Sequence, residues 1–464
     1  MNKQLLLALL AGGIAAGTTA TAHAQANDAL LNKLVAKGVL TKQEADELKT
    51  ESDSGFDKSY RAKTGLPDWV TSLKFSGDVR GRVEGFWTQN GSDAADNYNN
   101  DRWRMRYRLR FGMVATLKDQ LELGFRLTSD EGVGSGGSFG GDPISANTTF
   151  QDNGSKKFVY IDQAYGKWTP FKNDRWQLSG TIGKMANPFD VSTMVFDDDY
   201  TPEGVALQSM FNLNKEHALK FNGGFFWLDE ISQGSDSDND SFLLGAHLRW
   251  EAKWAPRIDS ALGVGIFALT DEQSLTNYSI PNLNVGNTRL ANGSLLYDYT
   301  PIVVDAAVTY TFDSGPLYKG KFPIRVAGTY MHNPSPSEDN EAYEAGIIFG
   351  KSGKKGTWDL SYRWRYMESD SWFEEITDSD FGGFYQVGLA NANSVPGTPG
   401  TLTGYRPGPG TKGHTFKASY SPYDALTLSV TYYLAELIDP PASSTSSNPE
   451  SEMNRIQIDA VWKF

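Results

Sequence analysis

The sequence predicts an all-β fold, namely a transmembrane antiparallel β-barrel of sixteen strands with short turns at one end and long loops at the other. Three observations predict it. Apolar and polar residues alternate with a period of two in many segments, the connections between these segments are short and long in turn, and the chain of 464 residues ends on an aromatic residue, Phe464. A period of two indicates strands, because successive side chains of a strand point to opposite faces.

Residues 1–24 are predicted to be an export signal that is cleaved off. Lys3 supplies a positive start, residues 5–16 are mostly apolar, and Ala22-His23-Ala24 forms a small-residue cleavage site. A buried N-terminal helix is the alternative, but the glycines in this stretch disfavour a helix. We therefore expect the mature chain outside the cytoplasm.

Residues 25–68 are predicted to form a small N-terminal helical segment in the periplasm. Gly38 ends a first helical pattern, and Thr41-Lys42-Gln43-Glu44 is typical of a capping box that opens a second helix. A spacer ahead of the barrel is the simpler interpretation. An oligomerisation or cell-wall contact is the alternative.

The barrel is predicted over residues 69–464, and one segment shows its pattern most clearly. From residue 102 to 111, five arginines at even positions alternate with Trp103, Met105, Tyr107, Leu109 and Phe111. Residues 157–168 show the pattern least clearly, since Asp162 and Gln163 disturb either assignment of faces. The complete set of predicted strands is 73–87, 101–117, 120–130, 157–168, 175–184, 203–213, 217–229, 240–254, 257–270, 301–312, 321–332, 341–351, 356–368, 413–421, 424–435 and 453–464.

The loops indicate a membrane barrel rather than a soluble sandwich. The seven turns that follow every second strand are mostly short, such as Lys118-Asp119 and Ala255-Pro256, whereas the other connections include 131–156, 271–300 and 369–412. Outer-membrane barrels have short periplasmic turns and long outer loops. A soluble β-sandwich has no reason to gather its long loops at one end.

The cost of burying charge in lipid assigns the two faces of each strand. An arginine at the bilayer midplane costs about 2–4 kcal/mol, so the arginine face must line a wet interior. Tryptophans gather near both ends of the strands, as in interfacial girdles. They are Trp87, Trp103 and Trp227 at one end, and Trp168, Trp176, Trp250, Trp254, Trp358 and Trp462 at the other. We therefore expect outer-membrane lipid around the barrel.

The last segment resembles the C-terminal signal that the barrel-assembly machinery recognises in outer-membrane proteins. Ile456, Ile458, Ala460, Trp462 and Phe464 alternate with polar residues up to the chain end. Trp462 and Phe464 are the expected assembly signal.

The chain as a whole resembles a Gram-negative porin of the sixteen-stranded general or "putative porin" type over about residues 70–464. Gly183-Lys184-Met185-Ala186-Asn187-Pro188-Phe189 is similar to the Gly-Arg-x-x-x-Pro-Phe stretch of trimeric porins, with Lys184 in place of Arg. The resemblance implies that the following loop folds into the lumen as a constriction. It also implies a homotrimer in which loop 131–156 reaches over a neighbour.

The pore-lining basic residues are expected on the polar faces of the first three strands. They are Lys74, Arg80, Arg82, Arg102, Arg104, Arg106, Arg108, Arg110 and Arg126. Arginine stays charged and binds carboxylate and phosphate groups well. The alternative is that some of them only neutralise lumen carboxylates such as Asp78, Glu84 and Glu122.

Opposing charge is expected from the third long loop, whose acidic residues are Asp190, Asp197, Asp198, Asp199 and Glu203. Folded inward, they would face the arginines and set up a transverse field that favours small polar solutes. The alternative is that Asp197 to Asp199 bind a surface cation or stay solvated.

Composition excludes several other classes of protein. The absence of Cys excludes disulfide frameworks and thiolate sites, and a net charge of −13 argues against nucleic acid as a partner. The five His show no metal-ligand spacing, and Gly132, Gly134 and Gly137 lack the βαβ context of a dinucleotide site. We expect no catalytic residue, metal or cofactor, although a barrel-embedded hydrolase is the enzyme alternative.

Three functions remain after these exclusions. The first is a porin for passive diffusion of small hydrophilic solutes and ions, and the second is a pore selective for anions, phosphate or organic acids. The third is a structural or adhesive barrel plugged by loops 271–300 and 369–412. We expect weak selectivity that leans toward anions, because Arg104, Arg106 and Arg108 are expected to face Asp197 to Asp199 at the narrowest point.

Overall fold

The structure is a computed structural model of the whole chain, and it describes residues 41–43, 65–90, 102–131, 140–230, 239–276, 279–281, 286–290, 292–382, 408–438 and 451–464. The chain separates into two compact units, Met1–Thr71 and Ser72–Phe464. The predicted export signal lies outside the described residues, as does nearly all of the predicted helical segment 25–68. Within the described residues, no helix has the length and apolar character needed to cross a membrane.

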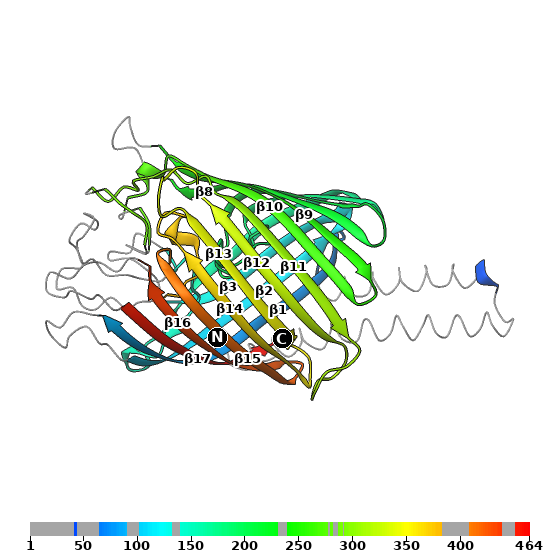
Figure 1. Cartoon of the computed structure of the whole chain (residues 1–464). Coiled ribbons are helices and arrows are strands. Elements are labelled where there is room, and N and C mark those ends of the chain that lie inside the picture. The colour runs from blue at the N-terminus through cyan, green and yellow to red at the C-terminus, as the bar shows by residue number, and fades with distance from the viewer. Residues whose placement is uncertain are drawn as a thin grey trace. The chain divides into compact units, whose positions relative to one another are not determined.

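The second unit is a closed antiparallel barrel, which confirms the predicted fold class (Figure 1). Each barrel strand pairs with the next barrel strand in sequence, and β1 closes the ring on β17 in a register that sets Val79 opposite Trp462. The barrel strands are β1 (Val70–Asn90), β2 (Arg102–Leu117), β3 (Leu121–Asp130), β5 (Phe158–Lys172), β6 (Trp176–Lys184), β7 (Glu203–Asn212), β8 (His217–Asp229), β9 (Ser241–Ala255), β10 (Ile258–Thr270), β11 (Ile302–Phe312), β12 (Phe322–His332), β13 (Glu341–Gly350), β14 (Thr357–Met367), β15 (Thr411–Tyr423), β16 (Leu426–Leu437) and β17 (Ser451–Lys463).

The remaining described elements are short and lie in the connections. They are β4 (Thr148–Thr149) and the 3-10 turns η1 (Lys118–Gln120), η2 (Asp152–Gly154), η3 (Glu272–Ser274) and η4 (Glu374–Ile376). β4 pairs with β2 at Arg106 and Tyr107. Thus the described part of loop 131–156, expected to reach over a neighbour, turns back onto its own barrel.

The strand faces follow the predicted assignment. On β2, Trp103 is 57% and Met105 is 54% exposed, whereas Arg108 on the opposite face is buried. Ile182 on β6 and Val264 on β10 are likewise apolar and exposed. An apolar exterior with a charged interior is the arrangement that a bilayer requires.

A β-bulge explains the irregular pattern of residues 157–168. Opposite β3, Arg126 pairs with Gln163 and Leu127 pairs with Ile161, so that Asp162 is the extra residue. The bulge shifts the alternation by one residue, and therefore Ile161 before it and Trp168 after it are both exposed on the outside. Asp162 is buried and forms an ion pair with Arg126.

The largest hydrophobic cluster lies inside the barrel rather than between two sheets. It joins residues of the connection 185–202, such as Phe189 and Phe196, to Trp372, Tyr299 and inward-facing strand residues such as Phe267. Long connections therefore fold into the barrel and pack against its inner wall. This packing positions the site.

Candidate functional site

The connection between β6 and β7, residues 185–202, enters the lumen at a glycine that no other residue can replace without strain. Gly183 has φ +116°, and a Cβ there would lie 2.3 Å from the carbonyl oxygen of Ala164. At the neck of the loop, the Lys184 ammonium donates to the carbonyl oxygen of Thr201 and to Glu203, each at 3.0 Å. Lys184 thus ties the two ends of the loop together.

Contacts with opposite walls show that this loop crosses the lumen, as the resemblance implied. On one side, the Phe189 ring packs edge-to-face on Phe267 of β10, with 5.0 Å between the ring centroids. On the other side, Asp199 lies 3.2 Å from the guanidinium nitrogens of Arg108 and Arg110 on β2. We call residues 185–202 the constriction loop.

A second inner segment, residues 368–382 after β14, packs on the constriction loop. The indole N–H of Trp372 donates to the carbonyl oxygen of Val195 at 2.9 Å, and the amide of Asp197 donates to the carbonyl oxygen of Ile376 at 2.9 Å. The amide of Asp378 donates to the carbonyl oxygen of Thr193 at 3.1 Å. The two segments therefore form one body inside the barrel.

A third connection braces this body. Arg289 donates to Glu374 at 2.6 Å in a fully buried ion pair, and its guanidinium also donates to the carbonyl oxygens of Leu275 and Gly293. Such a pair is tolerated without water because the remaining donors are satisfied as well. Loops 271–300 and 369–412, which the plug hypothesis invoked, thus both send described residues inward.

The predicted arginine wall lies in the lumen, but its members are paired with carboxylates. Arg108 lies 3.1 Å from Asp78 and Arg110 lies 2.8 Å from the same carboxylate. Arg104 forms an ion pair with Glu84, and Arg106 lies 3.7 Å from it. The neutralisation that the sequence left as an alternative therefore holds for most of this strand.

The other predicted basic residues have separate surroundings. Arg82 is held by Asp459 at 2.7 Å and by Asp380 at 3.4 Å, and Arg80 donates to the side chain of Asn147. Arg126 is paired with Asp162 at the bulge. Lys74 and Arg102 are exposed, toward opposite ends of β1 and β2.

The predicted acidic residues divide in the same way. Asp199 contacts the arginines, whereas Asp190 lies 3.2 Å from Arg249 on β9. Glu203 follows the outward parity of Val205 and Leu207 and pairs with Lys184, so it lies outside the lumen.

The carboxyl groups of Asp197 and Asp198 have raised pKa values. Asp197 is buried and accepts the amides of Asp199 at 2.7 Å and Ser379 at 2.8 Å. Burial, then the neighbouring Asp378 carboxylate, raises its pKa well above the ordinary value. Burial and the charges of Asp378 and Asp199 also raise the pKa of Asp198.

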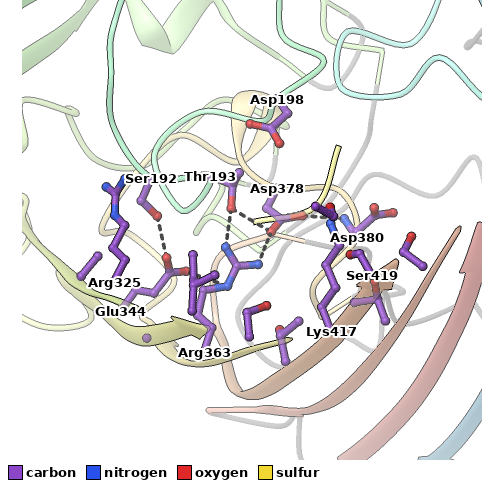
Figure 2. Close-up of a pocket in the computed structure, with 18 of the residues that line it drawn as sticks. Ser192, Thr193, Asp198, Arg325, Glu344, Arg363, Asp378, Asp380, Lys417 and Ser419 are labelled. Atoms are coloured by element: carbon purple, nitrogen blue, oxygen red, sulfur yellow. Dashed lines mark hydrogen bonds and ion pairs between the residues drawn. The ribbon is translucent and has the colours of Figure 1, made fainter. Parts of the chain in front are cut away.

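A cavity of about 790 Å³ extends from the inner segments toward the turn end of the barrel, where Ser352, Gly353 and Lys463 line it. Figure 2 shows Asp198 of the constriction loop above Arg325, Arg363 and Lys417, which come from β12, β14 and β15. Thr193 accepts from Arg363 at 3.0 Å, and Ser192 donates to Glu344 at 2.9 Å.

Sequence reasoning missed Arg325, Arg363 and Lys417 as site residues. Their signal was available, since each occupies the polar parity of its strand. Asp378 and Asp380 gave no such signal, because only the fold of the 368–382 segment brings them to the lumen. Burial opposes ionisation of Asp380, but Arg455 and Arg82 outweigh it and hold its pKa far below the usual range.

The cavity is lined by nine basic and eight acidic side chains, so it carries none of the excess negative charge of the chain. Most of these charges are paired with one another. Within the described residues, the lining side chains with no oppositely charged group at ion-pair distance are the cations Arg80, Arg325, Lys417 and Lys463 and one acid, Asp198. Mobile ions in the cavity therefore meet mainly unpaired positive charge.

A closed sixteen-stranded barrel with an apolar outside and a charged, loop-narrowed inside is a transmembrane diffusion channel. Residues 88–289 of the chain, somewhat less than half of it, match the family described as "Putative porin". The fold and this match support an outer-membrane channel for the passive diffusion of small hydrophilic solutes. The family match and the fold point to a channel rather than an enzyme.

Solved structures of outer-membrane channels are similar to this chain at low sequence identity. The high-pH structure of Pseudomonas putida OprB is 11% identical with a TM-score of 0.48, covering 89% of this chain and 97% of that one. The channel DcaP of Acinetobacter baumannii is 14% identical with a TM-score of 0.41, covering 85% and 97%. Salmonella typhi OmpF in complex with daunomycin is 10% identical with a TM-score of 0.44, covering 84% and 97%. No curated protein sequence matches the chain.

Proposed function

We propose that this porin is weakly selective for small anions over cations. The observation that carries the proposal is the unpaired charge of the cavity, four cations against Asp198. Paired charges cancel at the distance of a passing ion, whereas an unpaired Lys or Arg attracts anions by its full charge. The pKa of Asp198 is raised by burial, so acidification removes this one opposing charge at a higher pH than it would for an ordinary Asp.

The net charge of −13 does not contradict this proposal. Charges more than about 8–10 Å from the ion path are largely screened at physiological salt. Acidic residues on the exterior loops therefore contribute little, and the lining of the cavity dominates. A phosphate- or carboxylate-selective pore is the stronger form of the same idea.

The test is the reversal potential of single channels in a salt gradient across a planar bilayer. Replacing Arg325 and Lys417 by Glu should move the potential clearly toward cation preference. The control is Lys157→Glu, since Lys157 lies in an outer connection beside Asp152. The proposal fails if the Arg325 and Lys417 replacements leave the reversal potential unchanged, and a complete lack of conductance would instead favour the plugged barrel.

Arg106 and Arg108, the pair that the sequence favoured for this test, are less suitable. Glu at these positions would leave Glu84 and Asp78 without their ion pairs. The replacement would then disturb the wall as well as the field. Arg325 and Lys417 are exposed, and among the described residues no carboxylate lies at ion-pair distance from either of them.

We also propose that the porin is a homotrimer. The barrel exterior has an apolar hollow of about 650 Å³ whose lining includes Gly81, Met105, Phe150, Leu428 and Ala460. A Cβ on Gly81 would meet no atom within 4 Å, so a neighbouring copy has room there. Replacing Gly81 by Trp should shift the assembly toward monomers, as measured by light scattering. The control Leu207→Trp on β7 should leave the trimer intact. An intact trimer with Gly81→Trp would contradict this placement of the interface.

The two ends of the chain complete the proposal. We infer that residues 1–24 are removed on export, that residues 25–68 act as a periplasmic spacer, and that Trp462 and Phe464 present the last strand to the barrel-assembly machinery. Support comes from the sequence of these segments and from the place of Phe464 at the seam, where its amide donates to the carbonyl oxygen of Gly77 at 3.1 Å.

A further inference from the structure

One turn of the barrel folds outward, unlike a simple hairpin. Phe322 on β12 and Trp358 on β14 have the outward parity of Val326 and Leu360, which are exposed on the barrel exterior. The turn between β11 and β12 covers both rings. The indole N–H of Trp358 donates to the carbonyl oxygen of Pro316 at 3.1 Å, and the Tyr318 ring packs on Phe322 with 5.0 Å between centroids.

The tip of this turn is an apolar residue held away from the protein. Leu317 is 96% exposed and has φ +50°, a backbone conformation that a leucine rarely adopts. A strained, fully exposed leucine has no packing reason within the chain. It is explained if its surroundings are apolar, as they are at the edge of a bilayer.

Five lysines lie on two touching turns, one of which carries Leu317. The Lys319 amide donates to the carbonyl oxygen of Gly356 at 3.1 Å, and the Tyr318 hydroxyl donates to the carbonyl oxygen of Lys351 at 2.9 Å. All five side chains are exposed, and among the described residues none has a carboxylate at ion-pair distance. The lysines are Lys319, Lys321, Lys351, Lys354 and Lys355.

The acids near these lysines do not neutralise them. Asp313 of the same turn is paired with Arg257. Asp424 of the next turn accepts the backbone amide of Lys355 at 2.7 Å, while the Lys355 ammonium lies over the Tyr423 ring at 5.9 Å. Charged heads beside exposed aromatic rings are typical of the membrane–water interface, where lysine stems lie along apolar surface and the ammonium reaches polar headgroups.

We propose that this outward-folded turn and its neighbour, residues 313–321 and 351–356, bind anionic phospholipid headgroups of the periplasmic leaflet. The turn end of the barrel is periplasmic because outer-membrane barrels place their short turns there. Clustered lysines attract anionic lipid, and Leu317 reaches the acyl-chain boundary. The apolar tip favours lipid over the equally anionic cell-wall polymer, which offers no apolar surface.

The test measures lipid preference around the folded full-length mature protein. The protein is reconstituted in phosphatidylcholine vesicles with spin-labelled phosphatidylglycerol or spin-labelled phosphatidylcholine, and the motionally restricted fraction gives the relative association of the two lipids. We expect a preference for phosphatidylglycerol that weakens as salt is added. Replacing Lys319, Lys321, Lys354 and Lys355 by Gln should lower this preference by about threefold or more.

A matched control removes the same charge elsewhere on the same rim. Gln at Lys118, Lys172, Lys215 and Lys253, which lie in or next to four other turns, should leave most of the preference intact. Leu317→Ser should lower the association of phosphatidylglycerol with the charge unchanged. Unchanged single-channel conductance shows that each variant is folded.

Three results would overturn the proposal. The first is an equal loss of the lipid preference in the clustered variant and in the control with dispersed lysines, which would make the net charge of the rim the cause. The second is a clustered variant with the wild-type lipid preference. The third is a clustered variant that keeps this preference but no longer sediments with purified peptidoglycan sacculi that capture the wild type, which would assign the surface to the cell wall.

Discussion

Individual charged side chains in the lumen act in groups rather than singly. Asp78 accepts from both Arg108 and Arg110, and Asp199 of the constriction loop contacts the same two guanidiniums. These contacts fix the C-terminal part of the constriction loop to β2. The second-strand arginines therefore position the constriction, while the field that ions meet depends on residues such as Lys417 that are free of ion pairs in the described structure.

Asp198 gives the lumen a pH-dependent charge. Burial and the nearby carboxylates of Asp378 and Asp199 raise its pKa above the ordinary 3.8, although Arg363 and Lys417 oppose this shift. A raised pKa means that Asp198 takes up its proton at a higher pH than an ordinary Asp. Acidification should therefore remove its negative charge early and move the reversal potential toward anion preference.

Asp198→Asn should flatten that pH response, because the amide cannot ionise. Asp190→Asn serves as the control, since Asp190 also borders the cavity but lies beside Arg249. Asp190→Asn should retain the response. The same pH response in Asp198→Asn as in the wild type would assign it to another group, such as Asp197.

Phe464 closes the seam of the barrel. Its amide and carbonyl exchange hydrogen bonds of 3.1 Å with Gly77, and its ring stacks on Phe111 at 6.3 Å. Deleting Phe464 should lower the yield of assembled barrel without changing synthesis, whereas Phe464→Tyr should keep it. The measurement is the folded fraction in membranes by heat-modifiable gel mobility, and normal assembly after the deletion would remove the last residue from the recognition signal.

At the scale of elements, the constriction depends on two connections rather than one. Trp372 of the 368–382 segment is fully buried, and its ring lies 6.0 Å from Phe196 and 5.9 Å from Phe267. It therefore joins the constriction loop to β10. Phe189 of the constriction loop also packs on Phe267 of β10.

Trp372→Ala should loosen both connections at once. Truncating a buried Trp costs about 3–5 kcal/mol of packing, while the barrel hydrogen bonds that hold the wall are untouched. We expect a folded channel with larger conductance and noisier current in planar bilayers. The control is Trp254→Ala, which removes an exposed tryptophan of the barrel exterior. If Trp372→Ala has the conductance and noise of the wild type, the 368–382 segment does not hold the constriction.

At the scale of the whole molecule, stability comes from closure of the hydrogen-bonded ring. Every barrel strand has two neighbours, including the end strands β1 and β17. Among the strands that the structure describes, no edge is left unpaired, which is what lets a sheet exist in lipid. Exterior charge affects solubility and assembly but has little influence on the ion path.

We expect the mature protein to be a sheet-rich, heat-modifiable oligomer. Closed barrels resist detergent because unfolding must break the whole ring. Unheated samples should therefore migrate as an oligomer on gels, and boiled samples as a monomer, with a β-type circular dichroism spectrum before heating. A monomer in unheated samples would contradict the proposed trimer but not the barrel.

The sequence by itself determined the barrel and its faces. Strand alternation is local, since a period of two depends only on neighbouring residues, and the cost of arginine in lipid then decides which face is inside. The strand bounds, the tryptophan girdles and the closing strand with Phe464 all followed from it. Even the irregular strand β5 was predicted at its place, although only the pairing with β3 revealed the bulge at Asp162.

The tertiary structure decided which charges matter. Arg82 meets Asp459 across 377 residues of sequence, and the 368–382 segment brings Asp378 and Asp380 to the lumen without any periodic signal. Such pairs depend on the register of the closed ring and on the path of long loops, which no local pattern encodes. The alternation could show that an arginine faces inward, but only the folded barrel could show whether a carboxylate in the lumen forms an ion pair with it.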